Sequence, residues 1–141
     1  MILLDTDHLS ILKYPASSKA ISLTARLAAS PDQQIGTTII SVEEQWRGWL
    51  AAVARTRDIQ RQVKPYRELT SLLEFFGRWT VLPFVEAHAK QFQQIRGQGV
   101  RIGAMDLKIA CIALANNALL LSANASDFKR VPGLQVENWL D

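Results

Sequence analysis

The segment "MILLDTDHLS" (residues 1–10) contains four apolar residues that run without interruption into Asp5. A short continuous apolar run is typical of a strand buried on both faces, as in a parallel sheet, whereas strict alternation is typical of a strand with one solvated face. The segment therefore predicts a domain that begins with a buried parallel strand. It also places a carboxylate at the carboxyl end of that strand.

Further short apolar runs alternate with segments of helical periodicity along the rest of the chain. We expect strands at residues 1–4, 35–41, 78–84, 118–123 and 134–139, and helices at 7–14, 17–29, 42–57, 59–76, 86–96 and 104–116. Strands that alternate with helices predict an α/β domain with right-handed crossovers. The length of 141 residues predicts a single domain, residues 1–141. The last helix is expected to end at Asn116–Asn117, because asparagine tolerates the left-handed conformation of a helix cap.

The composition narrows the class of protein. Hydrophobic residues form 48% of the chain and charged residues 21%, as in soluble globular proteins. No apolar run approaches the roughly 20 residues of a membrane-spanning helix, and the opening run is too short and not basic enough for a signal peptide. We therefore expect a cytoplasmic protein without a membrane partner. One cysteine and two histidines are too few for the usual zinc sites, so we expect any metal to be bound mainly by oxygen.

Acidic and amide side chains follow strands or open helices at several separate points. In a parallel α/β sheet the functional site lies beyond the carboxyl ends of the strands, so we expect these side chains to converge there. Convergent carboxylates repel one another unless a cation neutralises them, and the pattern therefore predicts a site for Mg²⁺ or Mn²⁺. The residues concerned are Asp5, Glu43, Glu44, Asp106, Asn124 and Asp127.

Each of these acids also has a purely structural interpretation. Asp5 or Asp7 is a suitable N-cap for the first helix, because aspartate is favoured at that position. Ser41 and Glu44 match the capping-box pattern, and Asp106 falls in a first helical turn, where a carboxylate interacts favourably with the helix dipole. The two interpretations are compatible, since a carboxylate that caps a helix can still offer an oxygen to a metal.

Four motifs, taken in order, resemble those of the PIN-domain ribonucleases, and most closely the VapC-type toxins of bacterial toxin–antitoxin pairs. The motifs are "LLDTDHL" (3–9), "SVEEQWRG" (41–48), "IGAMDLKIACIALA" (102–115) and "LLLSANASDFKRVPGLQVENW" (119–139). The resemblance implies a three-layer α/β/α sandwich with a parallel sheet of strand order 3-2-1-4-5. It also implies a Mg²⁺- or Mn²⁺-dependent RNA endonuclease that forms a homodimer and is inhibited by a small antitoxin protein.

The resemblance assigns catalytic and metal-binding roles to particular residues. Asp5, Glu44 and Asp106 match the family's first three acids, which would be the metal ligands. The second acid is Glu44 because it lies four residues before Gly48, as the family's pattern requires. Metal-activated water then cleaves the phosphodiester bond, and no serine or histidine nucleophile is needed.

The fourth position of the family's site is less settled in this chain. It is often an acid within a T-x-D or T-x-N segment, and here the segment is Ser122-Ala-Asn124. Either Asp127 supplies the fourth carboxylate, or Asn124 binds or positions water through its amide oxygen. Thr6 and Ser122 offer hydroxyls for a carboxylate or a phosphate oxygen. Asp7 is interpreted as a helix-start or supporting residue.

Two further features receive separate interpretations. His8 is expected to be a structural or surface residue and not a catalytic one. A basic stretch extends from Arg47 to Arg67, with Asp58 within it and Glu68 directly after it. It is either a solvated helix face or a surface for phosphates. We take Arg55, Arg57, Arg61 and Lys64 from this stretch as the candidate RNA-binding residues.

Two other functions compete with the nuclease. "ILLDTDHLS" (2–10) nearly matches the D-x-D-x-[TV] loop of haloacid-dehalogenase-like phosphatases, in which the first aspartate, here Asp5, is the nucleophile. However, Leu9 occupies the position of the required threonine or valine, and the later lysine and paired-acid motifs have no match. The second alternative is a non-catalytic α/β binding module whose acids cap helices or hold a regulatory ion.

Overall fold

The structure, a computed structural model that describes residues 1–140, contains one sheet of five parallel strands. The strands are β1 (Ile2–Leu4), β2 (Ile35–Thr38), β3 (Thr80–Leu82), β4 (Leu119–Leu121) and β5 (Gln135–Glu137). Their order across the sheet is β3-β2-β1-β4-β5, and every neighbouring pair is parallel. The predicted strand order is therefore confirmed, with β1 at the centre.

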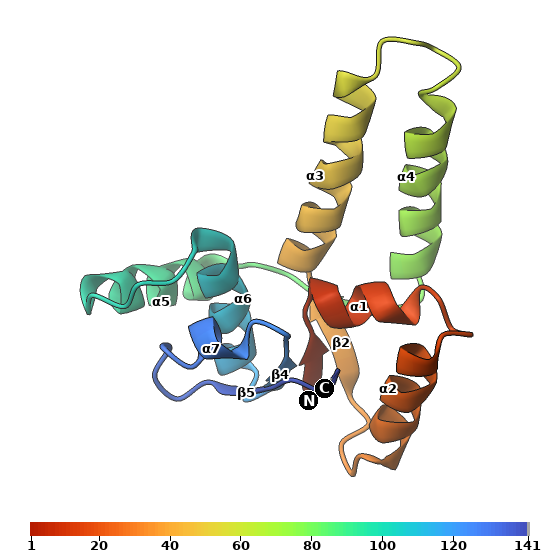
Figure 1. Ribbon diagram of the computed structural model, residues 1–141. Helices are drawn as coiled ribbons and strands as arrows, with labels where there is room; N and C mark the ends of the chain where they lie inside the picture. The colour runs from red at the N-terminus through yellow and green to blue at the C-terminus, as the bar shows by residue number, and fades with distance from the viewer. Residues whose placement is uncertain (141) are drawn as a thin grey trace.

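Helices connect the strands and cover both faces of the sheet (Figure 1). They are α1 (Thr6–Leu12), α2 (Ser18–Ala29), α3 (Ile39–Arg55), α4 (Val63–Phe76), α5 (Glu86–Gly97), α6 (Ala104–Ala115) and α7 (Ala125–Phe128). The short helix α7 was not predicted. Asn117 has a positive φ of 49°, which confirms the expected left-handed cap after α6. Within residues 1–140 no helix is both long enough and apolar enough to span a bilayer.

The central strand β1 contributes to two hydrophobic cores, one on each face of the sheet. Leu3 belongs to a core formed with α5, α6 and α7, whereas Ile2 and Leu4 belong to a core formed with α1, α2 and α4. All three side chains are at most 2% exposed. Burial on both faces explains why this strand is continuously apolar, and the result is a three-layer α/β/α sandwich.

Helix α3 begins earlier than predicted. Strand β2 ends at Thr38, whose hydroxyl accepts a hydrogen bond from the Ser41 backbone N–H and so caps the helix. The predicted capping box at Ser41 and Glu44 is therefore wrong, because Ser41 already lies in the first turn and Glu44 in the second. A threonine fits both a strand and an N-cap, so the strand can pass directly into the helix.

Helices α3 and α4 form a hairpin that projects away from the sheet (Figure 1). The helix predicted to start at residue 59 starts at Val63, because residues 56–62 form a turn. In this turn Asp58 Oδ1 accepts a hydrogen bond from the Gln60 backbone N–H, and the Gln62 side chain donates one to the Thr56 carbonyl oxygen. We call residues 39–76 the α3–α4 hairpin.

Candidate active site

The carboxyl ends of β1 and β4 and the starts of α1, α3, α6 and α7 meet at one edge of the sheet. Asp5 follows β1 directly, Glu44 lies in the second turn of α3, and Asp106 lies in the first turn of α6. Asn124 is the N-cap residue of α7. These acids lie close enough to affect one another's pKa values. Asp106 raises the pKa of Asp5, and both of these residues raise the pKa of Glu44. Side chains from distant parts of the chain therefore come together here.

Asp5 is 6% exposed and is held by two short hydrogen bonds. Its Oδ1 accepts from the Thr6 backbone N–H at 2.8 Å, which caps α1, and its Oδ2 accepts from the Ser122 hydroxyl at 2.8 Å. The Ser122 oxygen in turn accepts from the Asn124 backbone N–H at 3.0 Å. The structural and functional interpretations of Asp5 therefore coexist, and Ser122 ties the end of β4 to the acid that follows β1.

Burial and mutual repulsion favour protonation of the acids at this edge. Burial raises the pKa of Asp5 from 3.8 to about 6, although the hydrogen bonds from Ser122 and Thr6 oppose the shift. Burial, with the charges of Asp5 and Asp106, raises the pKa of Glu44 from 4.5 to about 7. The Thr6 hydroxyl lies 3.4 Å from Glu44 Oε2 and partly offsets this. These carboxylates repel one another, as the sequence predicted.

The amide of Asn124 bridges two carboxylates. Its Nδ2 donates to Asp106 Oδ2 at 3.0 Å and to Asp127 Oδ2 at 3.1 Å. The pKa of Asp106 is raised by burial and by the charges of Asp127 and Asp7, while the Asn124 hydrogen bond opposes the rise. Asp127 also lies 3.5 Å from an Arg130 guanidinium nitrogen. Asn124 thus acts as a donor that links α6 to α7.

Asp7 is the residue of this site that the sequence interpretation undervalued. Its Oδ2 accepts from the Ala123 backbone N–H at 3.0 Å and lies 3.5 Å from the Ser122 hydroxyl. Its charge also contributes to the raised pKa values of Asp5, Glu44 and Asp106. The feature of the sequence that could have indicated this role is the D-x-D spacing of Asp5 and Asp7, which also resembles the phosphatase loop. Asp7 therefore belongs with the other acids of this edge, and we call Asp5, Asp7, Glu44, Asp106 and Asp127 the acidic cluster.

The chemistry of these donors fits a divalent metal ion. Several carboxylates that resist ionisation share one edge, and hard oxygen ligands are those that Mg²⁺ and Mn²⁺ prefer. No group of three or more His, Cys, Asp or Glu side chains within residues 1–140 is arranged to hold a metal as it stands. Mg²⁺ needs only one or two protein carboxylates and retains several waters, so a closed cage is not required.

The candidate RNA-binding residues lie apart from the acids, on the far half of the α3–α4 hairpin. Arg55 ends α3, Arg57 and Arg61 lie in the turn, and Lys64 is in the first turn of α4. All four side chains are exposed. The hairpin carries them away from the sheet (Figure 1), so they form a separate cationic surface.

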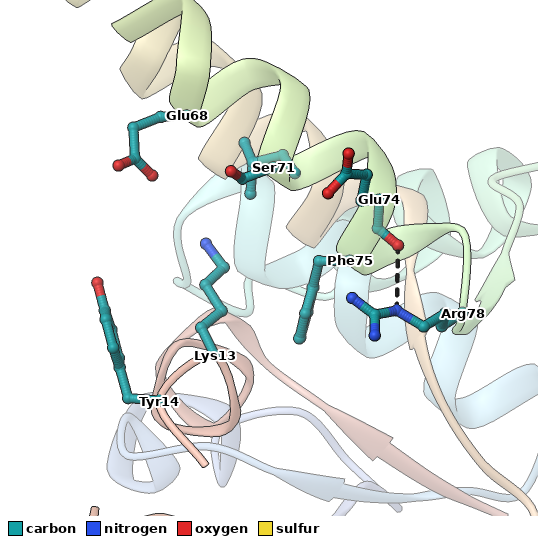
Figure 2. Close-up of a pocket in the computed structure, with 8 residues that line it drawn as sticks. Lys13, Tyr14, Glu68, Ser71, Glu74, Phe75 and Arg78 are labelled. Atoms are coloured by element: carbon teal, nitrogen blue, oxygen red, sulfur yellow. Dashed lines mark hydrogen bonds between the residues drawn. The ribbon is translucent and has the colours of Figure 1, made fainter. Parts of the chain in front are cut away.

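A pocket of about 340 Å³ lies between the end of α1 and helix α4, and contains none of the predicted site residues. The ring of Phe75 lies between Lys13 and Arg78 (Figure 2), with the Lys13 Nζ 5.9 Å from the ring centroid. Burial lowers the pKa of Lys13, and Glu68 opposes this. Two cations are balanced by Glu68 and Glu74, so the charge of the pocket does not indicate one class of ligand.

Comparisons with known proteins point to one family. The model of the PIN domain family matches residues 2–134. Ribonuclease VapC2 of Haemophilus influenzae is 35% identical over 80 residues, which cover 54% of this chain and 61% of that protein. The tRNA(fMet)-specific endonuclease VapC of Shigella flexneri is 32% identical over 84 residues, which cover 57% of this chain and 64% of that protein. The chain thus spans about three fifths of the length of these curated relatives.

A solved structure extends the similarity over the whole fold. The crystal structure of VapBC2 from Rickettsia felis, bound to a DNA fragment from their promoter, contains a chain that matches with a TM-score of 0.70 and 26% identity. The match covers 99% of both chains.

Proposed function

The chain belongs to the PIN domain family, and from that premise we propose that it is a metal-dependent endoribonuclease of the VapC type. The observation that carries the proposal is the acidic cluster at the carboxyl edge of the sheet. Burial in this cluster raises the pKa of both Asp5 and Glu44, to about 6 and about 7. Such a cluster destabilises the protein by itself, and a bound cation would remove that cost. The names of the similar ribonucleases support RNA as the substrate.

Asp5, Glu44 and Asp106 are the proposed ligands of Mg²⁺ or Mn²⁺. A bound ion of this kind lowers the pKa of water and neutralises charge on a phosphate. The protein's contribution is to hold the carboxylates in place and ionised. The Ser122 hydroxyl does so for Asp5, and the Thr6 hydroxyl is placed to do so for Glu44.

Asn124 and Asp127 share the fourth position of the proposed site. The Asn124 amide holds Asp106 and Asp127 together by donating to both carboxylates. Asp127 provides the additional negative charge that the uncharged Asn124 lacks, and it raises the pKa of Asp106. The proposed roles are therefore a positioning amide at 124 and a carboxylate at 127 that faces the water and substrate side.

The partners follow from the family resemblance. We include in the proposal a small antitoxin protein that inhibits the enzyme and a homodimeric assembly, in a cytoplasmic toxin–antitoxin pair. The similar chain from Rickettsia felis was solved as part of VapBC2 with promoter DNA, which supports a partner of this kind. The proposed RNA-binding surface is the exposed set Arg55, Arg57, Arg61 and Lys64 on the α3–α4 hairpin.

The phosphatase alternative finds no support in the structure. Its loop needs a threonine or valine at position 9, whereas Leu9 is fully buried in the core between α1 and the sheet. The family match also points elsewhere. The second alternative, a non-catalytic binding module, predicts that the purified chain cleaves no RNA.

The test is cleavage of a broad panel of RNAs by the purified chain, with Mg²⁺ or Mn²⁺ and with a chelator. We expect cleavage only with the metal. The variant Asp5→Asn should lose at least about a hundredfold in rate, since even the outer partners of metal ligands are commonly worth 10–100-fold. Equal behaviour of wild type and Asp5→Asn on every RNA would overturn the proposal and favour the binding module.

A further inference from the structure

His8 is a fully buried side chain that touches two separate parts of the fold. It lies in α1, and its side chain is 0% exposed. Its Nδ1 lies 2.6 Å from Asp7 Oδ1. Its Nε2 lies 3.2 Å from the backbone nitrogen of Trp139, in the segment that follows β5. The imidazole therefore lies between the acidic cluster and the C-terminal segment.

The two contacts determine where the imidazole proton lies. A backbone N–H can only donate, so Nε2 must accept from Trp139 and carry a lone pair. In the neutral ring the proton is then on Nδ1, from which it is donated to the Asp7 carboxylate. His8 is thus a donor to Asp7 whose tautomer is set by the backbone of a distant segment.

Asp7 is consequently fixed from both sides. One oxygen accepts from His8, and the other accepts from the Ala123 backbone N–H at 3.0 Å. The side chain is still 33% exposed, so the carboxylate faces solvent at the site while its hydrogen-bond partners are in the protein. The Nδ1 partner of this buried histidine is thus a carboxylate at the edge of the site.

The segment that sets the tautomer is itself anchored. The Trp139 ring packs against the core that contains β1, α1 and α2. The Arg26 guanidinium from α2 lies 4.2 Å from the centroid of that ring, within the range of a cation–π contact. The position of the Trp139 backbone N–H is therefore determined by packing.

We propose that His8 is a positioning residue, which uses the anchored backbone of Trp139 to orient Asp7 toward the metal and substrate side of the site. The inference rests on the proposed function, which supplies the metal and the reaction. The hydrogen-bonded contacts from Trp139 through His8 to Asp7 are independent of that function. The inference assigns a role at the active site to His8 and to the segment after β5, whereas the sequence predicted a structural or surface residue at position 8.

The first test is the tautomer of each histidine, read from long-range ¹H–¹⁵N NMR spectra of the wild-type protein at alkaline pH. The chain offers an internal reference, because His88 Nδ1 accepts from the Val85 backbone N–H at 3.0 Å and so requires the proton on Nε2. We expect opposite tautomers, Nδ1–H for His8 and Nε2–H for His88. An Nε2–H tautomer at His8 would overturn the proposal.

The second test measures Mn²⁺ affinity by calorimetry, without RNA. His8→Gln can still accept from Trp139 but has no donor at the Nδ1 position, whereas His8→Asn places its amide nitrogen near that position. We expect His8→Gln to bind Mn²⁺ about 10–100-fold more weakly, as for other supporting partners of metal sites. His8→Asn should recover most of this loss, and His88→Gln should bind as wild type does.

Thermal unfolding of the same three variants separates positioning from general stability. Equal loss of Mn²⁺ affinity in both His8 variants, in proportion to their loss of stability, would make His8 a structural residue only. The proposed reaction can fail independently of this role. If the tautomers and the variants' Mn²⁺ affinities are as expected but the wild-type protein cleaves no RNA, the reaction is refuted and the positioning role of His8 stands.

Discussion

The acidic cluster and the far half of the α3–α4 hairpin are built in opposite ways. The acids come from distant parts of the chain, Asp5 is buried and the others are partly buried, and hydrogen bonds such as that from Ser122 to Asp5 join them to other elements. The hairpin's cations come from one continuous stretch, are exposed, and need no support from the sheet. The charges of the cluster therefore cost stability, whereas those of the hairpin are solvated and cost little.

The two regions therefore tolerate substitution differently. Exposed charges on a local hairpin can be exchanged without disturbing the core. Partly or fully buried carboxylates with raised pKa values destabilise the folded protein unless a ligand compensates for their charge. We propose that the ligand in this protein is a metal ion. The comparison predicts that changes in the cluster affect activity and stability in opposite directions, while changes in the hairpin affect binding alone.

The largest expected effect is that of Glu44→Gln. The amide keeps a group that can accept from Thr6, but it removes a proposed ligand, so RNA cleavage should fall by at least about a hundredfold. Without metal the variant should be as stable as wild type or more stable, because it removes a carboxylate whose pKa burial raises to about 7. Cleavage rates and thermal unfolding measure the two effects.

The neighbouring residue provides a matched control. Glu43 was expected from the sequence to join the acids of the site, but it lies outside the acidic cluster and forms an ion pair with Arg47 on the exposed side of α3. Glu43→Gln should leave both the cleavage rate and the Mn²⁺ affinity unchanged. If Glu43→Gln is as harmful as Glu44→Gln, the contrast between cluster and surface fails for this helix.

A smaller effect is expected from charge reversal on the hairpin. The double variant Arg55→Glu, Arg61→Glu should bind RNA about tenfold more weakly at low salt, and the slope of log affinity against log salt should become shallower by about 0.7 for each phosphate that the protein no longer neutralises. Binding is measured by titration of RNA in an Asp5→Asn background, so that the RNA stays intact. Lys19→Glu on α2, also exposed, is the control.

The outcome separates two interpretations of the basic stretch. Unchanged affinity and slope in the double variant would make this part of the hairpin a solvated helix face. The Mn²⁺ affinity of the otherwise wild-type double variant should not change, because the cations lie apart from the acids. A changed Mn²⁺ affinity would show that the two regions are not independent.

The smallest effect is a pH dependence of stability. The folded-state pKa values of Asp5 and Glu44, about 6 and about 7, lie above their ordinary values of 3.8 and 4.5. Between about pH 4 and 7 the folded state therefore holds more protons than the unfolded state, and the free energy of unfolding falls as the pH rises through that range. Thermal unfolding of the metal-free protein should show a melting temperature a few degrees lower at pH 7.5 than at pH 5.

A divalent cation should reverse this trend. At a hundred times its dissociation constant it adds about 2.7 kcal/mol to the free energy of unfolding. At one fixed metal concentration the gain should be larger at pH 7.5 than at pH 5, because protons compete with the metal for the carboxylates and so raise its dissociation constant at low pH. Stability that rises with pH in the metal-free protein would contradict the proposed electrostatics of the cluster.

The sheet could be predicted from the sequence because its signals are strong. Continuous apolar runs such as residues 1–4 occur where both faces are buried, and the resemblance supplied the order of the strands. The start of α3 was missed because Thr38 can end a strand and cap a helix at the same time. The start of α4 was missed because two side-chain hydrogen bonds, one accepted by Asp58 and one donated by Gln62, shape the preceding turn.

The candidate site was predicted less completely. Asp5, Glu44 and Asp106 could be proposed from the sequence because each lies in a recognisable motif, and the structure brings them to the same edge of the sheet. The roles of Asp7 and His8 depend on contacts with Ala123 and Trp139, more than 100 residues away, and no local pattern records such contacts. The direction of the Asn124 amide is likewise a property of the folded site, because it depends on where α6 and α7 meet.

Helix α3 also fixes a length. It runs without a break from Ile39 to Arg55, with Glu44 near the sheet and Arg55 at the far end. Eleven residues at about 1.5 Å each separate these two positions by about 16 Å along the axis. In the proposed enzyme, an RNA that reached from Arg55 to the acidic cluster would therefore be bound near one end of this helix and cut near the other. Because α3 is continuous, the fold sets this spacing, and the proposed enzyme would favour RNAs whose shape places a phosphate at each of the two positions.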